Sequence, residues 1–100
     1  MAKFLLQGTS TNTDSGWVGV DECFLRADQQ SGNLYVDGTF DGATVTISVK
    51  PKGHAGNGVA LENGAFTAAD CKAQEFSPDL LVKAAVTDSG GSTSVNVWLG

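Results

Sequence analysis

The segment Leu34–Val49, LYVDGTFDGATVTISV, constrains the fold more than any other part of the chain. Its centre, Asp41-Gly42, is typical of a two-residue hairpin turn, because type I′ geometry requires positive φ at both central residues. If the flanking segments pair around this turn, the apolar side chains fall on one face and the polar ones on the other. We therefore predict a half-buried antiparallel hairpin. Its inward pairs would be Phe40 with Ala43, Gly38 with Val45, Val36 with Ile47 and Leu34 with Val49.

A second segment of the same kind, Leu80–Leu99, lies near the end of the chain. Closing it around the four-residue loop Asp88–Gly91 sets Thr87 opposite Ser92 and gives the pair one apolar face. Strict alternation places Trp98 on the opposite, outward face. We therefore predict a closing hairpin. Its inward pairs would be Val86 with Thr93, Ala84 with Val95, Val82 with Val97 and Leu80 with Leu99.

The rest of the chain is typical of short strands separated by turns. Trp17–Ala27 predicts one bent strand or two short ones, with a bulge or corner at Asp21-Glu22, where the alternation changes phase. The other expected elements are a strand over Lys3–Gln7, loops over Gly8–Gly16 and Pro51–Gly58, a short strand over Val59–Leu61, a turn at Glu62–Gly64, an ambiguous stretch over Ala65–Cys71 and a strand over Lys72–Phe76.

These elements add up to seven or eight short strands, a number typical of a sandwich or small barrel. We predict an all-β fold: a small antiparallel β-sandwich, Ig-like or jelly-roll-like, with little or no helix. A single domain is expected over residues 1–100, with residues 1–16 as an N-terminal arm or an edge strand. The 100 residues, 41% of them hydrophobic, suffice for one core.

Charge and composition narrow the range of partners and compartments. The net charge is −5 with only six basic residues, whereas phosphate binding needs clustered Lys and Arg. No apolar run has the length of a membrane span, and the start, MAKFLLQGTSTN, lacks the apolar core of a secretory signal peptide. We therefore expect a protein made in the cytoplasm, with Cys23 and Cys71 reduced and largely buried. A Cys23–Cys71 disulfide is the alternative.

No group of residues in the sequence predicts catalysis. His54 is the one histidine, and it lies in a glycine-rich loop with no Cys, Ser or carboxylate close by in the sequence. Two cysteines and one distant histidine do not make a zinc site, and the aspartates follow no calcium-loop pattern. A glycosidase pair of carboxylates stays open, because such pairs meet only in the folded protein. We expect a protein that is not an enzyme and has no catalytic residue, cofactor or metal.

Exposed apolar side chains say more about function. Trp98, Tyr35 and Leu81 are expected to face outward, and Trp and Tyr are favoured anchors of protein interfaces. The alternative for Trp98 is cover from the N-terminal segment or a loop, and Trp17 is expected to plug one end of the sandwich. Nothing in the sequence aligns the aromatic residues into a sugar-binding platform. The candidate interface residues are Phe4, Leu5, Leu6, Trp17, Tyr35, Leu81 and Trp98.

The segment GTFDGATVTISVKPKG, followed by LLVKAAVTDSGGSTSVNVWL, resembles a class of small tailed-bacteriophage proteins. The shared elements fall on Gly38–Ile47, Val82–Thr87 and Ser94–Leu99, whereas the loop Lys52–Gly58 departs from the usual pattern. The resemblance implies a virion component, either a capsid accessory or decoration protein or a tail-associated one. It brings no site residues with it.

Together, these observations predict a non-enzymatic structural component of a bacteriophage particle, made in the host cytoplasm and located in the virion. Its expected role is capsid decoration: it would bind the major capsid protein or other virion proteins, stabilise the shell and form homo-oligomers within the particle. The alternatives are a tail or head–tail connector component and a carbohydrate- or host-surface-binding module. Neither nucleic acid nor membrane is an expected partner.

Overall fold

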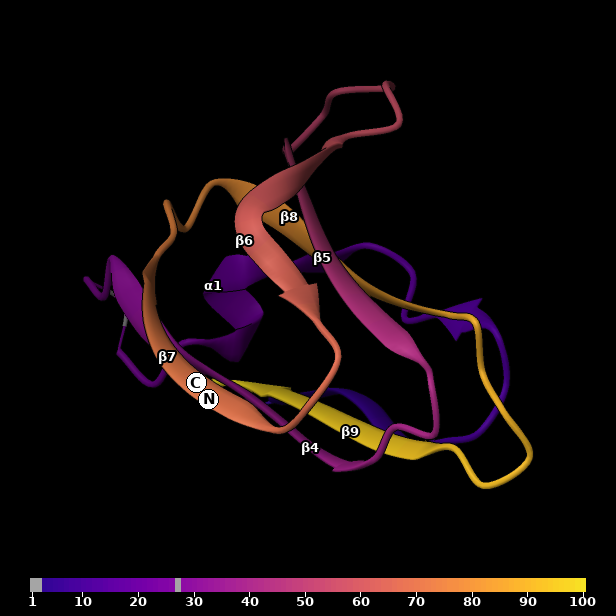
Figure 1. Ribbon diagram of the computed structural model, residues 1–100. Helices are drawn as coiled ribbons and strands as arrows, with labels where there is room; N and C mark the ends of the chain where they lie inside the picture. Colours follow the sequence, from indigo (N-terminus) through magenta and orange to yellow (C-terminus); the bar gives the residue numbers. More distant parts are fainter. Residues whose placement is uncertain (1–2, 27) are drawn as a thin grey trace.

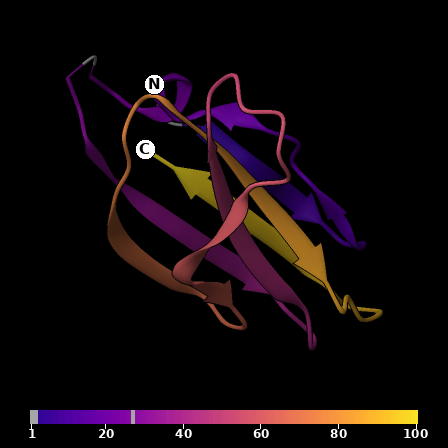
Figure 2. The ribbon, with the colours of Figure 1, turned by 90° about the horizontal axis from the view of Figure 1, so that it is seen from above.

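Two antiparallel sheets pack face to face around one core (Figure 1). The computed structural model describes residues 3–26 and 28–100. The outer ends of the expected arm 1–16 and of the expected strand Trp17–Ala27 therefore lie outside the described residues. Seen from above, the strands of both sheets run along the same diagonal, as in an aligned sandwich (Figure 2). The prediction of a small all-β sandwich is confirmed.

Nine strands are found among the described residues, two of them only two residues long. Sheet A has the order β1 (Lys3–Thr9), β9 (Ser94–Leu99), β4 (Ser31–Thr39), β7 (Asp70–Glu75). Sheet B has the order β2 (Thr13–Asp14), β8 (Leu80–Thr87), β5 (Thr44–Pro51), β6 (Val59–Phe66), and β3 (Val18–Gly19) also pairs with β8. Within residues 3–26 and 28–100, no helix is long and apolar enough to cross a membrane.

The inward residues of the long strands fill the space between the sheets. Alternation sends every second side chain of β4, β5, β8 and β9 into this space, where most are completely buried. The expected apolar faces are therefore confirmed, although not their pairing. The fully buried strand residues are Leu34, Val36, Val95, Val97 and Leu99 from sheet A, and Val45, Ile47, Val82 and Ala84 from sheet B.

Both predicted hairpins are wrong, because their strands belong to different sheets. β4 pairs with β7 and β9 in sheet A, while β5 pairs with β6 and β8 in sheet B. Likewise, β8 lies in sheet B and β9 in sheet A. Each predicted hairpin is an arch that crosses from one sheet to the other. The inward pattern is the same in both arrangements, because facing strands of a sandwich point their apolar residues at the same core.

The turn between β4 and β5 nevertheless has the backbone that its sequence predicts. Asp41 and Gly42 have φ of 47° and 85°, and the Ala43 N–H donates to the Phe40 carbonyl at 2.9 Å. The chains then diverge, since β4 pairs with β9 while β5 pairs with β8, and Gly38, with φ of 108°, lies against the backbone of Ser94 on β9. Turn chemistry is therefore satisfied locally, while the strands find other partners.

A short helix replaces the bulge expected at Asp21-Glu22. The helix α1 (Val20–Cys23) makes one turn, and the Glu22 carboxylate accepts a hydrogen bond from the Gly19 N–H at 3.1 Å. Val20 and Cys23 lie three residues apart, so the turn buries both against the core. The break in alternation therefore marks the point where the two-residue period of a strand changes to the helical period of α1.

β6 is one strand where a short strand and a turn were expected. Asn63, in the expected turn, has a φ of 57°, and the register with β5 shifts between Thr46 and Ser48. This geometry is a bulge within a continuous strand. β7 begins two residues before the expected strand Lys72–Phe76 and assigns Asp70 and Cys71 of the ambiguous stretch to sheet A.

β1 forms an edge of sheet A, where it pairs with β9. The register shifts between Phe4 and Leu6, so Leu5 is an extra residue relative to β9. This bulge lets Leu5 and Leu6 both enter the core, where they are 8% and 6% exposed. Of the apolar run predicted as an interface, these two residues are therefore core residues of their own chain, and Phe4 alone faces outward.

Candidate functional site

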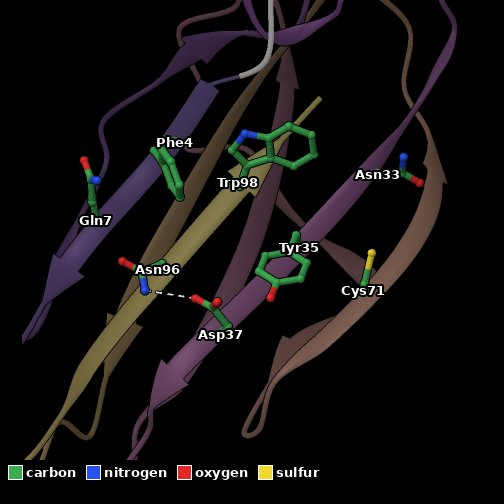
Figure 3. A pocket seen from close by; sticks show the side chains of 8 residues that line it. All are labelled: Phe4, Gln7, Asn33, Tyr35, Asp37, Cys71, Asn96 and Trp98. Atoms are coloured by element: carbon green, nitrogen blue, oxygen red, sulfur yellow. Dashed lines mark hydrogen bonds between the residues drawn. The ribbon is translucent and has the colours of Figure 1, made fainter.

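A row of three aromatic side chains crosses the outer face of sheet A. Phe4 on β1 lies opposite Trp98 on β9, and Trp98 lies opposite Tyr35 on β4. We call these three residues the aromatic row (Figure 3). Phe4 and Tyr35 are 48% and 41% exposed, and Trp98 between them is half-buried. The row therefore crosses three strands, and Cys71 on β7, the fourth strand, lies opposite Tyr35.

The aromatic row borders a hollow of about 540 Å³. This volume falls within the range of roughly 300–1,000 Å³ that is usual for ligand sites. Polar side chains close the hollow beside the rings, so its surface offers both apolar contact and hydrogen-bonding groups (Figure 3). The lining residues are Phe4, Gln7, Asn33, Tyr35, Asp37, Cys71, Asn96 and Trp98.

Hydrogen bonds fix the polar part of the hollow. The Asn96 amide donates from Nδ2 to Asp37 Oδ1 at 2.9 Å, and Asn96 Oδ1 accepts the Gly8 N–H at 2.8 Å. A hydrogen bond to the Asp37 carboxylate, together with its negative charge, raises the pKa of Tyr35, so this hydroxyl stays protonated at neutral pH. The carboxylate therefore has a neutral amide donor from its own chain and no counter-charge from the lining residues.

The rigidity of the face follows from its position on regular strands. Tyr35 and Asp37 are two residues apart on β4, and Asn96 and Trp98 are two apart on β9, so all four project on the same side. Asp37 and Asn96 are also direct cross-strand partners. Groups held on paired strands keep their geometry better than groups on loops, which favours a preformed binding surface.

The outer face of sheet B carries the remaining candidates, Trp17 and Leu81. The Lys50 and Lys83 Nζ atoms lie 4.7 and 4.8 Å from the centroid of a Trp17 ring. Trp17 also lies close above Gly58 of the loop after β5. The expectation that Trp17 plugs one end of the sandwich is wrong, because the tryptophan covers this outer face and already carries two cations from its own chain.

The cysteines and the histidine occupy separate places. Cys23 is buried and Cys71 exposed, and both are free thiols, so the expectation that both are buried is wrong for Cys71. Burial raises the pKa of Cys23, whose thiol donates to the Gly19 carbonyl at 3.7 Å. His54 is exposed, and its Nδ1 accepts the Gly56 N–H of the same loop. Among residues 3–26 and 28–100, no three His, Cys, Asp or Glu side chains group as metal ligands.

The structure thus divides the seven candidate interface residues among three environments. Sequence reasoning missed the alignment of the aromatic row, because the predicted hairpins set Tyr35 opposite Ser48 and Trp98 opposite Leu81. Alternation did show Tyr35 and Trp98 to be outward, but their adjacency depends on β4 pairing with β9. The candidates lie as follows: Phe4, Tyr35 and Trp98 on the outer face of sheet A, Trp17 and Leu81 on that of sheet B, Leu5 and Leu6 in the core.

Comparison with protein-family models, with curated proteins and with solved structures gives no match.

Proposed function

We propose that the protein is a non-enzymatic structural component of a bacteriophage particle, with capsid decoration as its role. In this role it binds the major capsid protein or another virion protein through the outer face of sheet A. The sequence resemblance to small phage proteins supports the virion assignment. A tail or head–tail connector position is the alternative within the same class, and a label at Gly100 visualised on particles distinguishes the two.

The observation that carries this proposal is the exposed aromatic row. Phe4, Tyr35 and Trp98 place large apolar surfaces side by side on one face, and about half of Phe4 and of Tyr35 is open to solvent. Contiguous exposed apolar surface bordered by polar groups is typical of an interaction site. Tyr and Trp are also the residue types that most often contribute strongly to binding.

The test is the variant Trp98→Ala in a co-sedimentation assay with particles from a phage strain that lacks this protein. Loss of a well-covered Trp costs about 2 kcal/mol or more at an interface, which is roughly a thirtyfold loss of affinity. The thermal midpoint should change little, because Trp98 lies outside the core between the sheets. Leu25→Ala is the matched control, since Leu25 is exposed but lies outside the hollow. Normal co-sedimentation of Trp98→Ala contradicts the proposal.

Self-association within the particle is part of the proposal. β6 and β7 are edge strands of their sheets, and Val59 on β6 is 69% exposed. An exposed edge offers unpaired N–H and C=O groups to a strand of another chain. Analytical ultracentrifugation over a range of concentrations tests this part. Val59→Lys should weaken any association through β6, because a lysine on an edge disfavours strand pairing.

A carbohydrate-binding module is a second candidate function, and the hollow favours it. The sequence alone aligned no aromatic residues, but the structure sets three rings in one row beside the Asp37–Asn96 pair. Rings together with fixed carboxylate and amide groups suit the apolar faces and hydroxyls of a sugar. Glycan-array binding that Tyr35→Ala abolishes would establish this function in place of the first.

A further inference from the structure

The aromatic rings of the two outer faces differ in whether basic side chains of the same chain contact them. On sheet B, Trp17 has Lys50 and Lys83 against its ring. On sheet A, the rings lie beside a carboxylate instead, and no lining residue of the hollow is basic. The cation–ring contacts among the described residues all involve Trp17 or Phe66 and none involves the aromatic row. The hollow on sheet A thus offers a carboxylate and aromatic rings to a cation, and none of its lining residues supplies one.

Asp37 gives this site a charge in a fixed position. Its carboxylate is partly buried and accepts a hydrogen bond from the Asn96 amide, a neutral donor. Tyr35 lies two residues before it on the same strand face. An ionised carboxylate offers about four lone-pair positions, so acceptor capacity remains for a further donor. The faces of Trp98 and Tyr35 attract a cation through their ring quadrupoles. Carboxylate and rings therefore act on the same ligand charge.

We propose that the hollow on the outer face of sheet A binds an arginine side chain presented by the protein partner. The inference rests on the proposed function, and it deepens that function by naming the chemistry of the partner. A guanidinium fits better than an ammonium, because its plane stacks on an aromatic ring while its N–H groups pair with a carboxylate. Gln7 and Asn33 at the border of the hollow are placed to bind the partner's backbone. The net charge of −5 also favours a basic partner surface.

A ligand titration followed by NMR tests the inference. The probes are N-acetyl-arginine methylamide and its neutral counterpart N-acetyl-citrulline methylamide, which has nearly the same shape and no charge. The indole N–H of Trp98 reports on the hollow, and that of Trp17 serves as an internal control on the other face. We expect the arginine probe to shift the Trp98 signal with millimolar affinity, as suits one side chain. We expect citrulline to bind at least about tenfold more weakly, because it lacks the charge.

Variants test whether the arginine probe binds in the hollow. Asp37→Asn keeps the size of the side chain and removes its charge, so it should lower the affinity for the arginine probe about tenfold or more. Asp88→Asn is the matched control, because Asp88 is exposed in the loop between β8 and β9, away from the hollow, and it should leave the affinity unchanged. Equal binding of both probes, or equal binding to wild type and Asp37→Asn, overturns the inference.

The outcomes also separate this inference from the proposed function. Absence of a Trp98 shift over the whole millimolar range overturns the arginine site, while normal particle binding by Trp98→Ala is what overturns the proposed function. Maltotriose and chitotriose are titrated in parallel. A Trp98 shift with either sugar that exceeds the shift with arginine overturns the inference in favour of a saccharide site.

Discussion

Thr93 is the one polar residue among the fully enclosed side chains of the described structure, at 3% exposed. Its hydroxyl donates to the Phe40 carbonyl at 2.8 Å and accepts the Gly90 N–H at 2.9 Å. The first bond joins the loop after β8 to the turn after β4. Asp41 adds a second link, since its Oδ2 accepts the Ser92 N–H at 2.8 Å. The two arches are therefore held together at one end of the sandwich.

Thr93→Val should lower the free energy of unfolding by about 1–3 kcal/mol, because the shape is kept while the Gly90 N–H loses its acceptor. Thr39→Val is the matched control at an exposed position of β4, where the expected change is within about 0.5 kcal/mol. Urea denaturation of both variants measures the difference. A Thr93→Val protein as stable as wild type would show that the link between the arches contributes nothing.

Gly38 has the closest backbone neighbour of the glycines in β4. Its φ is 108°, and a Cβ there would lie 2.1 Å from the Ser94 carbonyl oxygen, which is backbone and cannot rotate away. Gly38→Ala should destabilise the protein by about 3 kcal/mol or more, because backbone strain and overpacking each cost about 1–3 kcal/mol.

Gly53→Ala provides the comparison for Gly38. Gly53 also has a positive φ, 79°, but a Cβ there would meet nothing within 4 Å. Only the left-handed backbone penalty of about 1–2 kcal/mol applies. Denaturation midpoints of the two variants should therefore differ clearly. Equal midpoints would mean that β4 shifts away from Ser94 at little cost.

At the scale of elements, the sequence predicts faces better than partners. The inward residues of β4, β5, β8 and β9 follow from alternation, because the two faces of a strand meet different surroundings. Pairing does not follow, because an arch and a hairpin bury the same residues. The turn Asp41-Gly42 has the predicted φ values and still joins two sheets. Alternation thus located Tyr35 and Trp98 on outward faces, while their adjacency needed the long-range pairing of β4 with β9.

An ion pair joins α1 to the loop that follows β5. The Lys52 Nζ lies 2.8 Å from Asp21 Oδ1, and both side chains are about half exposed. The hydrogen bond from Lys52 is the main reason that the pKa of Asp21 lies below its ordinary value of 3.8. Because the folded pKa is depressed, the stabilisation is present above pH 3.8 and is lost as the pH falls through the folded pKa.

Lys52→Met should raise the pKa of Asp21 toward its ordinary value, because the variant has lost the donor and the positive charge. The pKa of Asp21 is measured from the NMR shift of its carboxyl carbon as a function of pH. Lys83→Met should leave Asp21 unchanged, since Lys83 lies against Trp17. High salt should shift the wild-type pKa in the same direction as Lys52→Met, because exposed charges are screened. A pKa that does not respond to Lys52→Met would show that the ion pair is not formed in solution.

At the scale of the whole molecule, the two outer faces have different chemistry. Sheet B covers its tryptophan with two lysines, whereas sheet A leaves rings exposed around a carboxylate. The core between them is continuous and apolar, and in the described residues no buried polar side-chain atom lacks a hydrogen bond. Since the core is complete without a partner, the exposed rings and the carboxylate on sheet A are available for binding another molecule.

The two cysteines allow this view of the molecule to be tested without a substitution. Cys71 borders the hollow and is exposed, while Cys23 is in the core with a raised pKa caused by burial. A thiol reagent should therefore modify one cysteine per chain rapidly in the native protein, because reaction needs an accessible thiolate. The second should react only as fast as the core opens, so its rate should rise with urea. Mass spectrometry after proteolysis identifies each site. Rapid modification of both would contradict a closed core, and slow modification of Cys71 that becomes faster on dilution would show that a second copy covers the outer face of sheet A.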